Sequence, residues 1–122
     1  MEIYSYQSSR WLKNYLELPL LVYDIVRHVP TGRVTTYAAI AETVGIRKAS
    51  PVIGFIMNLC RYENNPVPVH RVVNKNGVLT KKHQNGSEPK VSDLLFDEGI
   101  WVANNQISDF DTCFWHPSEL YH

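Results

Sequence analysis

Residues 32–45, GRVTTYAAIAETVG, are the most informative stretch of this chain. Thr35 or Thr36 can accept hydrogen bonds from the free N–H groups at a helix start, and Gly45 is typical of a helix end. The apolar side of the helix between them consists of Ala39, Ile40 and Val44. The stretch therefore predicts a short helix with one apolar side and a defined residue at each end.

A second short helix follows a basic turn, Ile46-Arg47-Lys48. It begins near Ala49 or Ser50 and runs toward Leu59, because Pro51 is tolerated in a first helical turn, where its missing N–H has no acceptor. Two short helices joined by a tight turn that contains glycine are typical of a helix-turn-helix. Many such helix pairs bind nothing, so the pattern alone leaves DNA binding open.

The flanking segments predict further elements. Residues 19–29, PLLVYDIVRHV, have the spacing of a helix opened by Pro19, and residues 1–18 predict a separate short helix. Residues 70–73, HRVV, indicate a short buried strand, and the turn NKNG after it lets residues 78–80 pair back as a hairpin.

The last part of the chain is less regular. Residues 81–87 predict a polar basic loop, from which Ser87 caps a last helix that ends at Gly99. The aromatic and acidic residues 101–122 give no structural assignment.

Composition indicates one globular domain. The chain has 122 residues, of which 44% are hydrophobic and 20% charged, and no apolar run has the roughly 20 residues of a membrane span. The N-terminus does not resemble a signal peptide. Cys60 and Cys113 are interpreted as reduced thiols of an intracellular protein, and no cluster of cysteine and histidine indicates a metal. We expect no cofactor.

Charge is unevenly distributed although the net charge is zero. Residues 31–90 hold nine basic and three acidic residues, a net charge of +6, whereas residues 91–122 hold six acidic residues and no Lys or Arg. A basic middle with an acidic end suggests one face that attracts anions, but a chance distribution over a solvated surface is about as good an explanation.

Three blocks of sequence resemble the C-terminal domain of the O6-alkylguanine-DNA alkyltransferases. They are GRVTTYAAIAETVG, then Pro68-Val69-His70-Arg71-Val72-Val73, then LLFDEG at 94–99, and their order fits from about Leu20 to Ile100. The resemblance implies an α+β fold, a winged helix-turn-helix DNA-binding domain that is mainly helical with a short β-hairpin wing. It divides the chain into an N-terminal extension (1–18), this domain (19–100) and a C-terminal tail (101–122).

In that family the second helix-turn-helix element enters the minor groove, and a damaged guanine swings into a pocket. A cysteine in a Pro-Cys-His-Arg motif then accepts the alkyl group, but this chain has Val69 at that position. Because transfer needs a thiolate, the resemblance implies a protein that is not an enzyme, in which His70 and Glu98 have no thiol to activate. The alkyltransferase-like proteins share this state, and they are thought to bind alkylated guanine and mark it for nucleotide excision repair.

The resemblance also assigns residues to sites. The implied DNA contacts are Arg33, Thr35, Thr36, Tyr37, Arg47, Lys48, Ser50, Pro51 and Lys75. The implied lesion pocket consists of Met57, Val69, His70, Lys82, His83 and Glu98, although Met57 could equally be core.

One departure concerns the nucleotide flip itself. Pro51 falls where the family has an arginine that fills the gap left by the flipped base. Proline can wedge between bases, but it lacks the stacking and hydrogen bonds of a guanidinium. Arg47 or Lys48, one turn away, could substitute.

The leading hypothesis is therefore a non-enzymatic, monomeric protein that binds alkylated double-stranded DNA and works with excision repair proteins. The alternatives are a regulatory or architectural winged-helix protein without lesion recognition, and a protein-interaction module that keeps only the fold. We expect a cytoplasmic, nucleoid-associated or nuclear protein that is neither secreted nor bound to a membrane.

Overall fold

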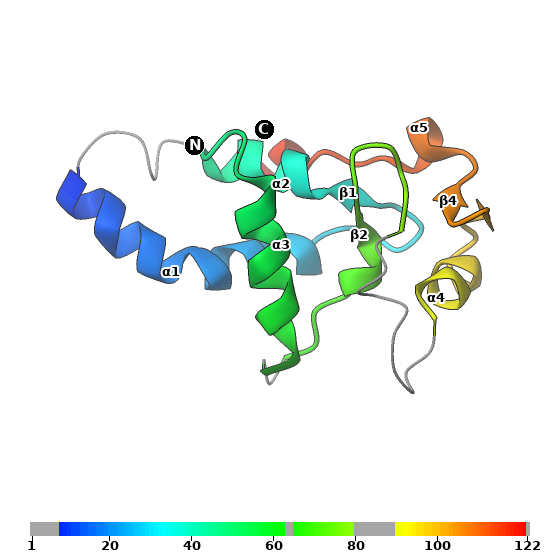
Figure 1. Cartoon of the computed structure of the whole chain (residues 1–122), viewed down its shortest axis with the longest axis horizontal. Helices are drawn as coiled ribbons and strands as arrows, with labels where there is room; N and C mark the ends of the chain where they lie inside the picture. The colour runs from blue at the N-terminus through cyan, green and yellow to red at the C-terminus, as the bar shows by residue number, and fades with distance from the viewer. Residues whose placement is uncertain (1–7, 63–64, 80–89, 122) are drawn as a thin grey trace.

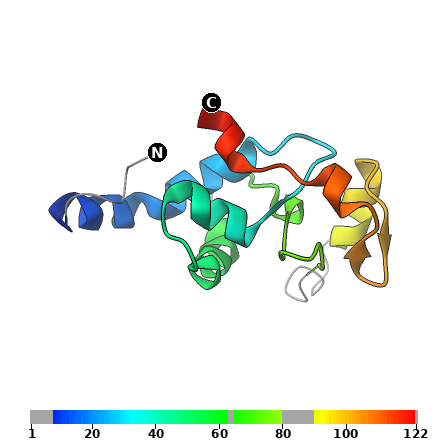
Figure 2. The same ribbon diagram turned by 90° about the horizontal axis from the view of Figure 1, so that it is seen from above.

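The computed structural model describes residues 8–62, 65–79 and 90–121. Its elements, in chain order, are α1 (Ser8–Arg27), β1 (Thr35–Thr36), α2 (Tyr37–Val44), α3 (Ser50–Asn58), η1 (Leu59–Tyr62), η2 (Val69–Arg71), β2 (Val72–Val73), α4 (Val91–Asp97), β3 (Val102–Ala103), β4 (Gln106–Ile107), α5 (Phe110–Cys113) and η4 (Pro117–Tyr121). Helices α1, α2 and α3 form one end of the molecule, and α4, β4 and α5 form the other (Figures 1 and 2). None of the described helices is long and apolar enough to cross a membrane.

The expected break at Pro19 is wrong, because one helix, α1, passes through it. A proline inside a helix costs about 3 kcal/mol, through a lost hydrogen bond and a clash. The apolar side chains that α1 buries completely around this point are Leu18, Val22, Ile25 and Val26. Each contributes about 1.5–3 kcal/mol on burial, so packing outweighs the local penalty.

The helix-turn-helix prediction is confirmed. The Thr36 hydroxyl accepts a hydrogen bond from the Ala39 N–H (3.0 Å) at the start of α2. Gly45 ends α2 with a φ of 89°, a left-handed conformation that glycine adopts without steric cost. Helix α3 begins at Ser50 with a proline in its first turn, as expected.

Two apolar clusters form the core. One lies among α1, α2 and α3, where Ile40 and Ile53 are fully buried. The other lies under α4 and the C-terminal hairpin, and Leu95 and Ile100 are at its centre. Strand β1 pairs in parallel with β2 between the two clusters and joins the two ends of the molecule.

The hairpin prediction is wrong in its location. Residue Val78 forms an isolated antiparallel bridge with Gln106 and does not pair with β2, and Leu79 N–H donates to the Asn105 carbonyl (3.0 Å). The hairpin of the structure is β3–β4. Local sequence could not reveal that the segment 102–107 supplies the pairing partner. Thr80 and Ser87, which belonged to the predicted hairpin and helix cap, lie outside the described residues.

The C-terminal segment is part of the core although its residue pattern supported no assignment. Val34 and Phe114 form a parallel bridge on the side of β1 away from β2, and Trp115 N–H donates to the Val34 carbonyl (2.7 Å). The Trp115 side chain is buried. The chain after α4 therefore extends the small sheet and covers its edge.

Candidate nucleic-acid interface

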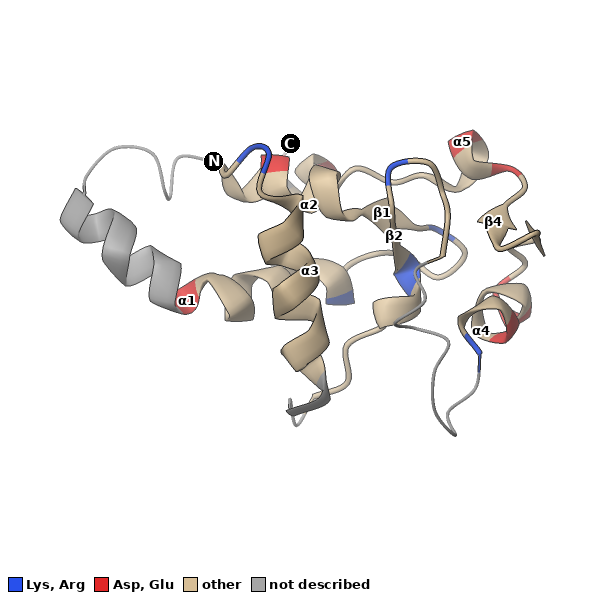
Figure 3. Ribbon diagram, in the orientation of Figure 1, with Lys and Arg blue, Asp and Glu red and all other residues tan. Residues whose placement is uncertain are grey.

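The turn between α2 and α3 presents positive charge. Arg47 and Lys48 are both exposed, and Lys48 adopts a left-handed φ of 65° that helps the chain reverse direction before α3. Ser50 is half-buried and Pro51 exposed in the first turn of α3. Figure 3 shows this basic turn in blue at the top of α3, next to an acidic residue of α2 in red and away from the acidic residues of α4 and α5.

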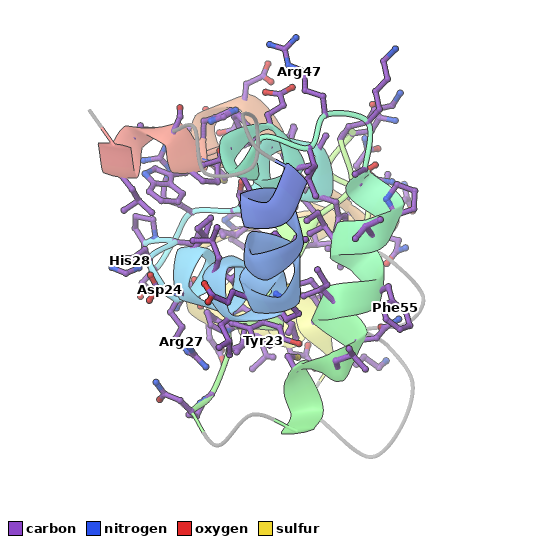
Figure 4. The ribbon with its side chains drawn as sticks, turned by 90° about the vertical axis from the view of Figure 1, so that its left-hand side faces the viewer. Tyr23, Asp24, Arg27, His28, Arg47 and Phe55 are labelled. Atoms are coloured by element: carbon purple, nitrogen blue, oxygen red, sulfur yellow. The ribbon has the colours of Figure 1, made fainter. Side chains whose placement is uncertain are left out.

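The outer face of α3 is apolar. Phe55 has 64% of its surface exposed and lies one turn after Pro51, and Leu59 at the helix end is 37% exposed. Figure 4 shows Phe55 pointing outward from α3. Sequence reasoning missed Phe55, although its spacing of four residues from Pro51 would have placed both on one side of a helix.

The side chains before α2 are engaged inside the protein. Arg33 donates from Nε to the Cys113 carbonyl (3.0 Å) and from Nη2 to the Phe114 carbonyl (2.6 Å). Thr35 is fully buried, and Thr36 caps α2. The C-terminal segment and the core thus hold these three side chains, and the predicted contact of this helix start with DNA stays a prediction. Tyr37, the first residue of α2, is half-buried against the core.

Lys75 lies on a rigid turn that faces solvent. The Asn74 side chain accepts hydrogen bonds from the N–H groups of Asn76 (2.8 Å) and Val78 (2.9 Å), which fixes the turn. Lys75 is exposed and lines a cavity of about 230 Å³. The other lining residues are Thr36, Phe110, Asp111 and Phe114.

A polar cluster follows Val69. His70 Nε2 lies 2.6 Å from Glu98 Oε2, and Arg71 donates to the same carboxylate from Nε (3.1 Å) and Nη2 (2.9 Å). The Gly32 N–H donates to Glu98 Oε1 (2.8 Å). Arg71 also donates to the Val29 carbonyl (3.0 Å), so the cluster links η2 to the segment after α1 and to the end of α4.

The cluster keeps Glu98 ionised. Burial raises the pKa of Glu98, but hydrogen bonds from Arg71, the Gly32 N–H and His70, with the charge of Arg71, outweigh burial and lower the pKa to about 2. An ionised carboxylate only accepts hydrogen bonds, so His70 Nε2 carries the proton that it shares with Glu98. The expected pair of His70 and Glu98 is thus formed in the structure.

The remaining pocket candidates differ in their surroundings. Val69 is half-buried against the cluster of α1, α2 and α3, and Met57 is buried within that cluster and is a core residue. Lys82 and His83 lie outside the described residues. Both thiols, Cys60 and Cys113, are half-buried, and burial together with Asp109 raises the pKa of Cys113.

Comparison with known proteins identifies the family. The DNA-binding domain model of the 6-O-methylguanine DNA methyltransferases matches residues 18–100. Alkyltransferase-like protein 1 of Schizosaccharomyces pombe is 33% identical over 89 residues, which are 73% of this chain and 82% of that protein. The chain is a member of the alkyltransferase-like family.

Two further comparisons agree with this membership. A DNA base-flipping protein of Escherichia coli is 29% identical to this alkyltransferase-like chain, over 80% of its length and 74% of that protein. A crystal structure of the S. pombe protein with damaged DNA containing O6-carboxymethylguanine superposes with a TM-score of 0.68 at 29% identity, and it covers 81% of this chain and 94% of that one. The expected α+β, winged-helix-like fold is thereby confirmed.

Proposed function

We propose that this alkyltransferase-like protein binds O6-alkylguanine in double-stranded DNA and accepts no alkyl group. The observation that carries the proposal is the complete cluster of His70, Arg71 and Glu98 directly after Val69. The family's activating pair is present, but the residue beside it has no nucleophilic atom.

The two thiols of the chain do not substitute for an acceptor at position 69. Cys60 is in η1 and packs against the core of α1, α2 and α3, whereas Cys113 ends α5 at the other end of the molecule. A raised pKa leaves Cys113 mostly protonated at neutral pH, and the thiol form is a poor nucleophile. Recognition without transfer is therefore the chemistry that these residues favour.

The charge distribution supports DNA as the ligand. Arg47, Lys48 and Lys75 are exposed, whereas four exposed acids lie on or beside α4 and α5. Those acids are Asp93, Asp97, Asp109 and Asp111. Lysine and arginine attract phosphates, although exposed acids also lie near them: Asp111 lines the same cavity as Lys75, and Glu42 is exposed in α2 shortly before the basic turn.

In the proposed complex α3 approaches the minor groove, Tyr37 and the α2–α3 turn contact the backbone, and the damaged nucleotide turns out toward Val69 and His70. Lys82 and His83 are proposed to cover that nucleotide. We also propose that the protein acts as a monomer and that the bound complex is the signal for excision repair proteins.

Pro51 supports a second candidate, a winged-helix protein that binds DNA without recognising lesions. Proline lacks the guanidinium that fills the gap in the base stack, and extruding a base costs a few kcal/mol. Without a group that offsets this cost, damaged and undamaged duplexes would bind alike.

Fluorescence anisotropy with two labelled duplexes separates these functions. One duplex carries a single O6-methylguanine, and the other has guanine at the same position. The proposal predicts tighter binding to the damaged duplex. Equal binding to both duplexes supports the second candidate, and no binding to either contradicts both.

A further inference from the structure

The outer face of α3 carries two exposed apolar side chains, Pro51 and Phe55, between the polar residues Ser50 and Asn58 at the helix ends. Its sequence, SPVIGFIMN, contains no charged residue. Ile53, Ile56 and Met57 face the core, whereas Pro51 and Phe55 are exposed on the other side. A helix at the surface normally carries polar residues on its solvent side. This composition indicates that another molecule covers the outer face of α3.

The residues around this face indicate the kind of molecule that covers it. Arg47 and Lys48 immediately precede α3, and the helix itself has no acidic residue that would repel phosphate. In Figure 4, Arg47 extends at one end of α3 and Phe55 projects from its side. Positive charge next to an apolar surface suits a ligand with anionic and aromatic parts, which describes the backbone and the bases of DNA.

We propose that Phe55 inserts into the DNA base stack and, with Pro51, forms an apolar wedge that holds the duplex open. This inference rests on the proposed DNA-binding function. Proteins that bind the minor groove insert Phe, Leu or Pro side chains between base steps and unstack them. The phenyl ring of Phe55 offers a flat surface on which a base can stack, which Pro51 alone does not provide.

Because Phe55 is exposed, its ring can be removed to test the wedge without disturbing the core. With 64% of its surface exposed, Phe55 contributes little to the core, and the packing of Ile53, Ile56 and Met57 remains when its ring is removed. Truncation is therefore expected to leave the thermal unfolding temperature nearly unchanged. Leu20 on α1 is similarly exposed, at 62%, so Leu20→Ala is a matched control outside the proposed face.

The experiment uses a duplex that contains O6-methylguanine with 2-aminopurine beside it, whose fluorescence rises when it unstacks. Phe55→Ala is expected to weaken binding about 5- to 150-fold, the range for loss of one base–aromatic stack. It should also reduce the 2-aminopurine signal at saturating protein. The dependence of affinity on salt should stay unchanged, because no charge is removed. Phe55→Trp, which keeps a flat ring, should retain affinity and signal, and Leu20→Ala should behave as wild type.

Three outcomes overturn the inference. Wild-type affinity and fluorescence in Phe55→Ala, in a protein that prefers the damaged duplex, would exclude the wedge but leave the proposed function standing. Weaker binding with an unchanged 2-aminopurine signal would make Phe55 a groove contact that opens nothing. Failure of the wild-type protein to bind either duplex would reject the proposed function and the wedge together.

Discussion

The cluster around Glu98 makes its contacts within the protein, whereas the outer face of α3 leaves an apolar side chain exposed to solvent. Glu98 accepts hydrogen bonds from His70, Arg71 and the Gly32 N–H, and Arg71 reaches a further carbonyl. The outer face of α3, in contrast, leaves Phe55 largely in solvent. A cluster whose hydrogen bonds are made within the protein stabilises the free protein, whereas an exposed apolar surface beside basic residues is free to make the DNA contact that we propose. Changes in the first should therefore affect folding, and changes in the second should affect binding.

Removing the carboxylate should have the largest effect. Glu98→Ala leaves the guanidinium of Arg71, whose side chain is 16% exposed, without its anion, and we expect a loss of about 3 kcal/mol in the free energy of unfolding. Urea denaturation measures this loss. Asp97→Ala removes an exposed carboxylate from the same helix and should change stability by less than about 0.5 kcal/mol. Equal effects of the two substitutions would mean that the cluster contributes no stability.

The same cluster should make stability depend on acid pH. Because the folded-state pKa of Glu98 is lowered from 4.5 to about 2, its contribution is fully present above about pH 4.5. The contribution is lost as the pH falls toward 2, by up to about 3 kcal/mol. Urea denaturation of wild type and Glu98→Gln at several pH values tests this, since the variant should lack this part of the pH dependence. Parallel curves for the two proteins would contradict the assignment.

Substitutions in the α2–α3 turn should weaken DNA binding and leave the stability of the fold unchanged. Arg47→Ala combined with Lys48→Asn should reduce the log–log slope of affinity against salt by about 1.8, or 0.9 for each phosphate that is no longer neutralised. Asparagine is chosen because it tolerates the left-handed φ of Lys48. Lys90→Ala, an exposed lysine at the start of α4, should leave the slope unchanged. A double variant with the wild-type slope would place the DNA-binding face elsewhere.

A cysteine placed at position 69, beside the cluster of His70, Arg71 and Glu98, should have a lowered pKa. In Val69→Cys the new thiol adjoins His70, and its pKa should fall below the roughly 8.5 of a free cysteine. Reaction with a small alkylating reagent across pH, compared with wild type to subtract Cys60 and Cys113, gives this value. A thiol that titrates like free cysteine would show that the pair of His70 and Glu98 does not activate position 69.

The sequence predicted the elements whose signals are local. Thr36 and Gly45 mark the ends of α2, and a proline in the first turn marks the start of α3. The pair of His70 and Glu98 followed from family resemblance. The continuity of α1 through Pro19 and the partner of Val78 depend on packing between distant segments, so local patterns gave the wrong answer.

The C-terminal segment also makes contacts with a predicted site residue that the sequence did not reveal. Arg33 was predicted to contact DNA, and in the structure the carbonyls of Cys113 and Phe114 accept hydrogen bonds from its side chain. No sequence pattern predicted that residues 113–115 lie beside β1. Phe55 was missed although it lies four residues after Pro51, because an aromatic residue at helical spacing is usually core, whereas the structure shows that it is exposed.

The most direct measurement follows the alkyl group itself. Protein is incubated with a duplex whose O6-methylguanine carries a labelled methyl group, the complex is isolated, and protein and DNA are separated under denaturing conditions. Recognition without transfer predicts that the damaged duplex is retained in the complex and that all label remains on the DNA. Stoichiometric label on the protein, at Cys60 or Cys113, would contradict it.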